Sequence, residues 1–257
     1  MVRGKKQGAG TIFFSGCNLR CVFCQNHQIS QQNFGKICSI EDLAGIMIEL
    51  QNEKTVCIDL VTPTIWWEQI GKAIITAKRN GLTIPVVWNS NGYEKVEMLK
   101  NLEGLVDIYL PDFKYGDNAP AFKYSGANDY VETATAAIQE MRWQVGLLKL
   151  DSNGLAEKGL IVRHLVLPNN IENSNRVFQI LAKIDPRIHI SLMYQYFPLF
   201  RARESPEINR ILTNEECEQV FDLMWEAGLK NGWAQKPGSS DSLVPDFQRE
   251  RPFEKES

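Results

Sequence analysis

Residues 15–26 read Ser-Gly-Cys-Asn-Leu-Arg-Cys-Val-Phe-Cys-Gln-Asn, and this stretch decides how the rest of the chain is interpreted. It places Cys17, Cys21 and Cys24 within eight residues. The residues before it, 10–15, are rich in β-branched and aromatic side chains and predict a strand. The cysteines therefore follow a strand directly, on the loop at its C-terminal end. In α/β folds, ligands and catalytic groups gather at that end of the sheet.

Outward from this loop, strand-like and helix-like segments alternate along the chain, six of each. The predicted strands are mostly continuous apolar runs, which favours parallel strands covered on both faces. They span residues 10–15, 56–61, 84–88, 106–112, 160–167 and 189–197. Alternation with right-handed crossovers gives either a barrel or an open doubly wound sheet. Six units are two short of a complete barrel, so we expect an α/β fold, a partial TIM barrel of (βα)6 type, with the open sheet as the alternative.

The helical segments carry recognisable boundaries. Ser39 followed by Asp42 predicts a capping box, and apolar residues continue from it at helical spacing. Gly81, Gly104 and Gly228 predict helix ends. Helices are expected near residues 40–50, 66–80, 94–102, 128–145, 173–184 and 213–227. Residues 114–126 are expected to form an irregular loop, and residues 150–159 a hairpin turn.

Length and charge limit the organisation and the partners. A chain of 257 residues that is 44% hydrophobic can bury one substantial core, so residues 1–235 are expected to form a single core domain. The tail, residues 236–257, is rich in Pro, Ser and charge and is expected to be poorly ordered. A formal net charge of −3 gives no sign of the basic surface that a nucleic-acid partner usually requires, and it does not exclude one. No apolar run near the N-terminus is long enough for a signal peptide or a membrane span, so we expect a cytoplasmic protein without a membrane partner.

The cysteines point to a metal site rather than to disulfides. Thiolates are the usual ligands of iron–sulfur clusters, and a cubane cluster takes four, so three leave one iron without a protein ligand. An open coordination position is typical of a catalytic metal. The alternatives are a structural zinc site completed by His27 or Cys38, and a ferredoxin-like electron carrier, in which most of the chain would have no role. The scattered thiols are expected to be bystanders: Cys38, Cys57 and Cys217.

The C-x3-C-x2-C spacing, with Phe23 before the last cysteine, resembles the signature of the radical S-adenosylmethionine (SAM) superfamily. The likeness covers residues 10–235: the sequence is similar to pyruvate formate-lyase activating enzymes, and more closely to an uncharacterised branch of radical SAM proteins named after them. Segments 10–17, 60–64, 89–93, 107–114, 163–168 and 231–233 carry it. The resemblance implies a radical SAM core, in which a 4Fe–4S cluster on Cys17, Cys21 and Cys24 binds SAM. Reductive cleavage of SAM would then give a 5′-deoxyadenosyl radical that abstracts hydrogen from a substrate.

The resemblance also assigns cofactor contacts to other strand ends. Asp112 and Lys114 match the Asp-x-Lys pair that contacts SAM in the activating enzymes. Thr62 and Thr64 stand where the superfamily commonly carries a Gly-Gly-Glu motif for the SAM amino group. Gln195 replaces a histidine near the SAM ribose. The other candidates for SAM or substrate contacts are Phe23, Asn89, Ser90 and Arg163.

Plainer interpretations of the same residues remain open. Asp112 and Lys114 could form an ordinary surface ion pair. Residues 62–64 could simply end a strand, and residues 89–91 could simply form a turn. Arg163 and His164 are adjacent on a strand, so they point to opposite faces and at most one faces a barrel lumen. We expect His164 to be a satisfied structural residue.

The sequence departs from the family pattern in two places. Relatives generally carry a longer N-terminal region with additional cysteines, so we expect an auxiliary metal site to be missing. Ile65 replaces a family histidine, so no catalytic role is expected there.

The first function is an activase acting on a glycine of a glycyl radical enzyme, with a flavodoxin or ferredoxin-type electron donor. The second is a radical SAM enzyme acting on a small molecule, peptide or RNA. The third is a non-catalytic zinc or iron–sulfur protein.

Overall fold

The computed structural model describes residues 8–236, 238, 245–249 and 252. Seven parallel strands adjoin one another in the order β1-β2-β3-β4-β6-β7-β8, and no ladder between described residues joins β8 back to β1. The sheet is therefore a partial barrel, as expected. The strands are β1 (Gly10–Phe13), β2 (Ile58–Val61), β3 (Val86–Asn89), β4 (Ile108–Tyr109), β6 (Ala156–Leu165), β7 (His189–Met193) and β8 (Gly232–Ala234).

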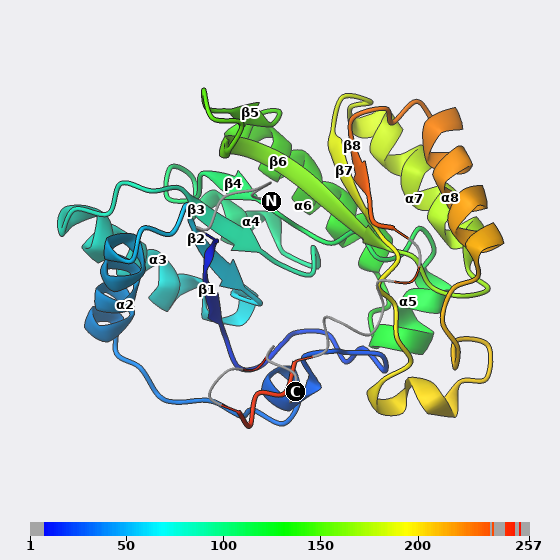
Figure 1. Cartoon of the computed structure of the whole chain (residues 1–257), viewed down its shortest axis with the longest axis horizontal. Coiled ribbons are helices and arrows are strands. Elements are labelled where there is room, and N and C mark those ends of the chain that lie inside the picture. Colours follow the sequence, from blue (N-terminus) through cyan, green and yellow to red (C-terminus); the bar gives the residue numbers. More distant parts are fainter. Residues whose placement is uncertain (1–7, 237, 239–244, 250–251, 253–257) are drawn as a thin grey trace.

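Helices cover the outside of this curved sheet (Figure 1), with α2 and α3 beside β1 and β2, and α7 and α8 beside β7 and β8. The predicted capping box is confirmed: Ser39 Oγ accepts from the Asp42 N–H, and the Asp42 carboxylate accepts from the Ser39 N–H. None of the described helices is long and apolar enough to cross a membrane. The helices are α1 (His27–Ser30), α2 (Ile40–Asn52), α3 (Trp67–Arg79), α4 (Val96–Lys100), α5 (Asn118–Ser125), α6 (Tyr130–Val145), α7 (Ile171–Ile184) and α8 (Asn214–Glu226), with short 3-10 turns η1 (Thr64–Trp66) and η2 (Phe200–Glu204).

The structure corrects the expected count of six strands and the expected loop at 114–126. The loop is wrong because residues 118–125 form α5, whose N-terminus is capped by Asp117 and whose end is Gly126 in the left-handed region at φ 73°. β8 was missed because it has three residues and begins at a glycine. That glycine is required there, since a Cβ on Gly232 would lie 2.0 Å from the Ile190 carbonyl oxygen. The predicted hairpin is confirmed, because β5 (Lys149–Leu150) pairs antiparallel with β6.

Strand alternation separates an apolar outer face from a polar lumen. On β2, Ile58 and Leu60 are fully buried, whereas Asp59 and Val61 line a central cavity. On β6, His164 is fully buried and Arg163 lines the cavity, so the two residues do point to opposite faces. Every second residue of these strands is thus available to a ligand in the lumen.

Part of the C-terminal tail returns to the cysteine loop. Residues 237, 239–244, 250–251 and 253–257, and with them most of the tail expected to be poorly ordered, lie outside the described residues. In the described part, the ring of Phe247 meets the ring of Phe13 edge-on at 5.1 Å. Gln28 holds the same turn, because its Nε2 donates to Asp246 Oδ1 at 3.1 Å and its Oε1 accepts from the Phe247 N–H at 2.7 Å. Residues 246–247 therefore dock beside β1 and α1.

Candidate functional site

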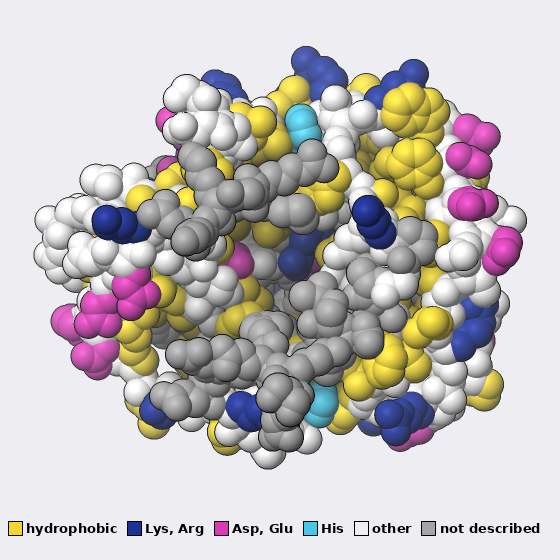
Figure 2. All heavy atoms as spheres, in the orientation of Figure 1, with side chains coloured by type: hydrophobic (Ala, Val, Ile, Leu, Met, Phe, Trp, Pro, Cys, Tyr) yellow, Lys and Arg dark blue, Asp and Glu magenta, His cyan; other side chains and the backbone are white. Residues whose placement is uncertain are grey.

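A cavity of about 670 Å³ opens at the C-terminal edge of the strands. This volume falls within the roughly 300–1,000 Å³ of ordinary ligand pockets. Figure 2 shows a hollow near the centre of one face, in which both basic and acidic side chains are visible. All the predicted site residues except Thr64 line the cavity: Cys17, Cys21, Phe23, Cys24, Thr62, Asn89, Ser90, Asp112, Lys114, Arg163 and Gln195.

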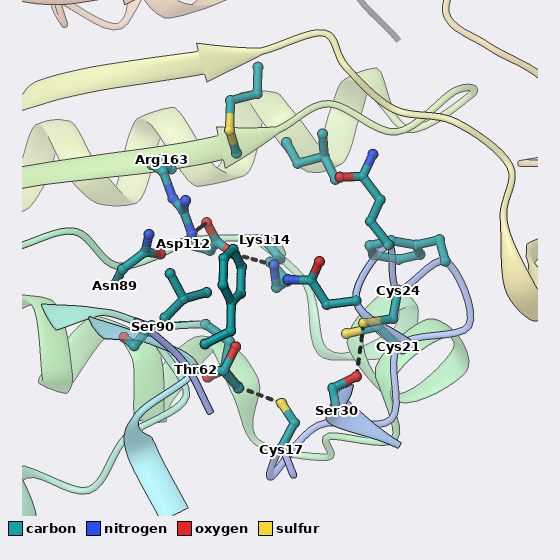
Figure 3. A pocket seen from close by; sticks show the side chains of 18 of the residues that line it. Cys17, Cys21, Cys24, Ser30, Thr62, Asn89, Ser90, Asp112, Lys114 and Arg163 are labelled. Carbon is teal, nitrogen blue, oxygen red and sulfur yellow. Dashed lines mark hydrogen bonds and ion pairs between the residues drawn. The ribbon is translucent and has the colours of Figure 1, made fainter. Parts of the chain in front are cut away.

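Two of the cysteine thiols have polar neighbours from separate segments (Figure 3). Asn91, in the turn after β3, donates through Nδ2 to Cys17 Sγ at 3.3 Å. Ser30, at the end of α1, places its hydroxyl 3.1 Å from Cys24 Sγ. Ser30 is almost completely buried, so this hydroxyl is not an incidental surface contact. Both sulfurs are therefore oriented by the protein rather than left to rotate.

The third thiol ends a buried chain of hydroxyls. The Tyr115 hydroxyl lies 2.6 Å from Ser125 Oγ, and Ser125 Oγ donates to Cys21 Sγ at 3.0 Å. Burial raises the pKa of Cys21 to about 12, although the charge of Lys114 opposes the rise. A thiolate at this position thus needs positive charge beside it, and a bound metal centre supplies that charge.

The donor set fits a cluster better than a single zinc ion. Zinc needs four donors about 2.0–2.3 Å from one centre. Among the described residues, no group of three or more His, Cys, Asp and Glu side chains converges in that way. His27 stacks on Phe200 at 4.7 Å, and Cys38 is exposed, so neither completes a tetrahedron. Three thiols around one side of a roomy cavity suit a cubane cluster with one iron left open.

A charged group faces the cysteines from β4 and β6 (Figure 3). Arg163 Nη2 lies 2.7 Å from Asp112 Oδ1, and Lys114 Nζ pairs with Asp112 Oδ2. Burial alone would raise the pKa of Asp112, but the charges of Arg163 and Lys114 outweigh it and hold that pKa below its ordinary value. Burial alone would lower the pKa of Lys114, and Asp112 keeps it raised. The group is mostly buried in the cavity wall rather than on the surface, and it carries one net positive charge.

The two threonines after β2 are separated by the structure. Thr62 lines the cavity with φ at 60°, a conformation that a β-branched residue rarely adopts outside functional sites. Thr64 does not line it, because its hydroxyl donates to Glu94 Oε1 at 3.0 Å. Buried Glu94 is a residue that sequence reasoning missed, and it also accepts hydrogen bonds from Trp88 Nε1 and Ser90 Oγ. Thr64 therefore joins a structural network at the ends of β2 and β3.

Phe23 and Gln195 complete the predicted set. The Phe23 ring packs edge-on against Tyr196 at 5.8 Å. Gln195 Oε1 accepts from Gln235 Nε2 at 2.6 Å, which ties the end of β7 to the end of β8. Both side chains are thereby fixed at the cavity wall.

Other lining residues were missed by sequence reasoning. Asp59 had a signal, because it is the one charge in an otherwise apolar strand, residues 56–61. Ser30 and Pro252 had none, since one lies in a four-residue helix and the other in the tail. The remaining missed residues that line the cavity include Thr11, Phe13, Gln25, Asn26, Leu165 and Met193.

Comparisons with known proteins agree with this architecture. A family model described as the radical SAM superfamily matches residues 11–143. The uncharacterized protein MJ0674 of Methanocaldococcus jannaschii is 34% identical over 223 residues, which are 83% of this chain and 61% of that protein. The uncharacterized protein MJ0808 of the same organism is 24% identical over 233 residues, 86% of this chain and again 61% of that protein. The chain thus spans about three-fifths of the length of these relatives.

A solved structure shares the fold at low identity. SuiB of Streptococcus suis, in its complex with the precursor peptide SuiA, superposes with a TM-score of 0.62 at 11% identity, and the match covers 90% of this chain and 49% of SuiB. SuiB bound to S-adenosylmethionine gives a TM-score of 0.60 at 13% identity, covering 90% of this chain and 48% of that one. At such identities the likeness concerns the fold alone.

Proposed function

Because the chain belongs to the radical SAM superfamily, we propose that it is a radical SAM enzyme that abstracts hydrogen from a substrate held in the barrel lumen. The family uses a 4Fe–4S cluster and SAM. In this chain Cys17, Cys21 and Cys24 would hold the cluster. When bound, the two groups together supply a one-electron cleavage of SAM that yields a 5′-deoxyadenosyl radical. The fold's own task is to bind, orient and exclude water.

The observation that carries the proposal is that three oriented thiols and a cationic group share one cavity. Lys114 and Arg163 together outweigh Asp112, which leaves positive charge for a carboxylate such as that of SAM. Asp112 binds the two cations through different carboxylate oxygens and so fixes their positions in the cavity wall. Thr62, whose hydroxyl and backbone lie at the end of β2, stands where the amino group of SAM would need acceptors.

For the substrate, we favour a small molecule or short peptide. The described part of the tail supports this choice, because Phe247 contacts Phe13 and Pro252 lines the cavity. A loop of a folded partner protein would have to displace these residues to reach the lumen. The second candidate is an activase of a glycyl radical enzyme, favoured by the Asp112–Lys114 pair lying in the cavity as it would in an activating enzyme. For either candidate we propose a flavodoxin or ferredoxin-type electron donor, and the six free cysteines fit a reducing compartment such as the cytoplasm.

Anaerobic reconstitution tests the proposal. We expect about four irons per chain, as a cubane cluster requires, and release of 5′-deoxyadenosine when SAM and a reductant are added. Cys21→Ala should lose both. One zinc per chain, or a cluster that never cleaves SAM, would overturn the assignment. Incubation with candidate glycyl radical enzymes separates the two substrate classes, because only the activase produces a glycyl signal in electron paramagnetic resonance.

A further inference from the structure

Asp59 places a carboxylate inside the lumen, away from the cysteine loop. It lies on β2, opposite Thr11 of β1 and Val87 of β3 in the strand register. Thr62 at the end of β2 is three residues further on, and a strand rises about 3.3 Å per residue. Asp59 is therefore roughly 10 Å deeper in the barrel than the strand end, and it still lines the cavity. A ligand group that reaches Asp59 must extend down into the lumen.

The charge of Asp59 is not matched by an ion pair. Lys114 and Arg163, the two cations among the described residues that line the cavity, are both paired with Asp112. Within the described residues, no ion pair involves Asp59. The hydrogen bond that it accepts from Asn89 is long, since Asn89 Nδ2 lies 3.4 Å from Oδ2. The carboxyl group thus lies in a polar but poorly compensated place.

Two acceptor oxygens in this wall lack partners. Asp59 Oδ1 and Asn89 Oδ1 are buried and accept no hydrogen bond from the described residues. A buried acceptor without a partner destabilises the folded protein, because it has lost its hydrogen bonds to water. The carboxylate torsion is soft, so rotation about χ2 exchanges the two Asp59 oxygens at little cost. A ligand with several N–H donors could donate a hydrogen bond to each of these two oxygens.

The pKa of Asp59 also reflects the poor compensation of its charge. Burial raises its pKa, and the hydrogen bond from Asn89, the charge of Arg163 and a hydrogen bond from Thr11 oppose the rise only in part. A carboxyl group that lines a cavity and has a perturbed pKa is a candidate functional residue. A positive ligand beside Asp59 would favour its ionised form.

We propose that Asp59 and Asn89 form a subsite for a protonated primary amine, so that the substrate is an amine-bearing small molecule or peptide end whose ammonium group enters the lumen. An ammonium has three donors, which suffice for the carboxylate of Asp59 and the amide oxygen of Asn89. This inference rests on the proposed function, because it assigns the substrate class of the same cavity. SAM also carries an ammonium group, so the test must separate the two sources.

The probe is n-butylammonium, compared with the neutral molecule 1-butanol, in titrations of the cluster-loaded protein with SAM present. Saturable binding is followed by ligand-observed nuclear magnetic resonance. We expect butylammonium to bind at least tenfold more tightly than butanol, and Asp59→Asn to reduce its affinity at least tenfold. Asp222→Asn, which removes an exposed carboxylate on α8, is the matched control and should change nothing.

Each contrary result is decisive. Equal binding of the amine and the alcohol by the wild-type protein would overturn the subsite, and this comparison does not depend on the variant folding. Unchanged amine affinity in Asp59→Asn would overturn the role of that residue. A tenfold loss of SAM affinity in Asp59→Asn would assign Asp59 to the cofactor and overturn the substrate claim. If the chain neither assembles a cluster nor cleaves SAM, the proposed function fails. The binding of butylammonium is a separate measurement, so its failure is distinguished from the failure of the proposed function.

Discussion

Arg163 reaches Asp112 because their backbones are paired: the Arg163 N–H donates to the Pro111 carbonyl at 2.8 Å, and the Phe113 N–H donates to the Arg163 carbonyl at 2.8 Å. These bonds continue the β4–β6 pairing beyond the regular strand and bring the guanidinium 2.7 Å from Asp112 Oδ1. The sheet itself therefore positions the charged group that faces the cysteines. Asp112 acts as the anchor that holds two cations in one wall.

Asp112→Asn should weaken SAM binding at least tenfold without unfolding the protein. The amide removes the charge that orients Lys114 and Arg163, so the two cations repel each other and their side chains are no longer held in place. Calorimetric titration of SAM into the cluster-loaded variant measures the effect. Glu172→Gln, which breaks the exposed ion pair with Arg176 on α7, is the control and should leave SAM affinity unchanged. Wild-type affinity in Asp112→Asn would show that the charged group does not bind the cofactor.

Ser125→Ala should make the cluster harder to reduce. The Ser125 hydroxyl donates to Cys21 Sγ, and a hydrogen bond to a cluster sulfur stabilises the more negative, reduced state. We expect the ratio of reduced to oxidised cluster at a fixed potential to fall several-fold, measured by electron paramagnetic resonance in a redox titration. Ser30→Ala should act in the same direction through Cys24.

Ser174→Ala is the control for this series, because Ser174 is equally buried but bonds to His164 rather than to a thiol. An unchanged midpoint in both Ser125→Ala and Ser30→Ala would contradict the assignment of these hydroxyls to the cluster.

Thr64→Val should destabilise the protein and leave SAM affinity intact. The Thr64 hydroxyl donates to the buried carboxyl group of Glu94, and hydrogen bonds to charged groups contribute about 1.5–3 kcal/mol. The free energy of unfolding in urea should fall by about that amount. If SAM affinity falls instead while stability is kept, Thr64 contacts the cofactor after all.

Sequence predicted the outline of the fold because most strands read as nearly continuous apolar runs that alternate with helical patterns. The failures were local. Residues 114–126 were expected to form an irregular loop, yet Asp117 caps α5 and Pro120 lies in its first turn, where an N-cap aspartate and a proline are both favourable. A three-residue strand such as β8 carries too little pattern to be seen without its partner β7.

The candidate site was predictable where the ligating residues are close in sequence. Cys17, Cys21 and Cys24 are close together on one loop, so their shared chemistry is readable without a structure. Ser125 contacts Cys21 from 104 residues away, and no short-range pattern announces such a pair. Only packing decides which hydroxyl reaches which sulfur.

His164 should make the protein sensitive to mild acid. Its Nδ1–H donates to the Phe113 carbonyl and its Nε2 accepts from Ser174 Oγ, so it is held neutral. Burial lowers its pKa from 6.5 to about 4, although the Phe113 carbonyl and Asp112 oppose the shift. Between those values the unfolded chain binds the proton and the folded chain does not, so stability rises with pH. The free energy of unfolding should be about 2 kcal/mol lower at pH 5 than at pH 7.5 on account of this group.

Urea unfolding of the wild-type chain and of His164→Gln at the two pH values isolates that contribution. The glutamine keeps a donor and an acceptor but does not titrate, so its unfolding free energy should lose this part of the pH dependence. Asp59 and Glu94, whose pKa values burial raises, act with the opposite sign, and the difference between the two proteins cancels them. Parallel pH profiles for both proteins would mean that His164 takes up its proton in the folded state as readily as in the unfolded chain.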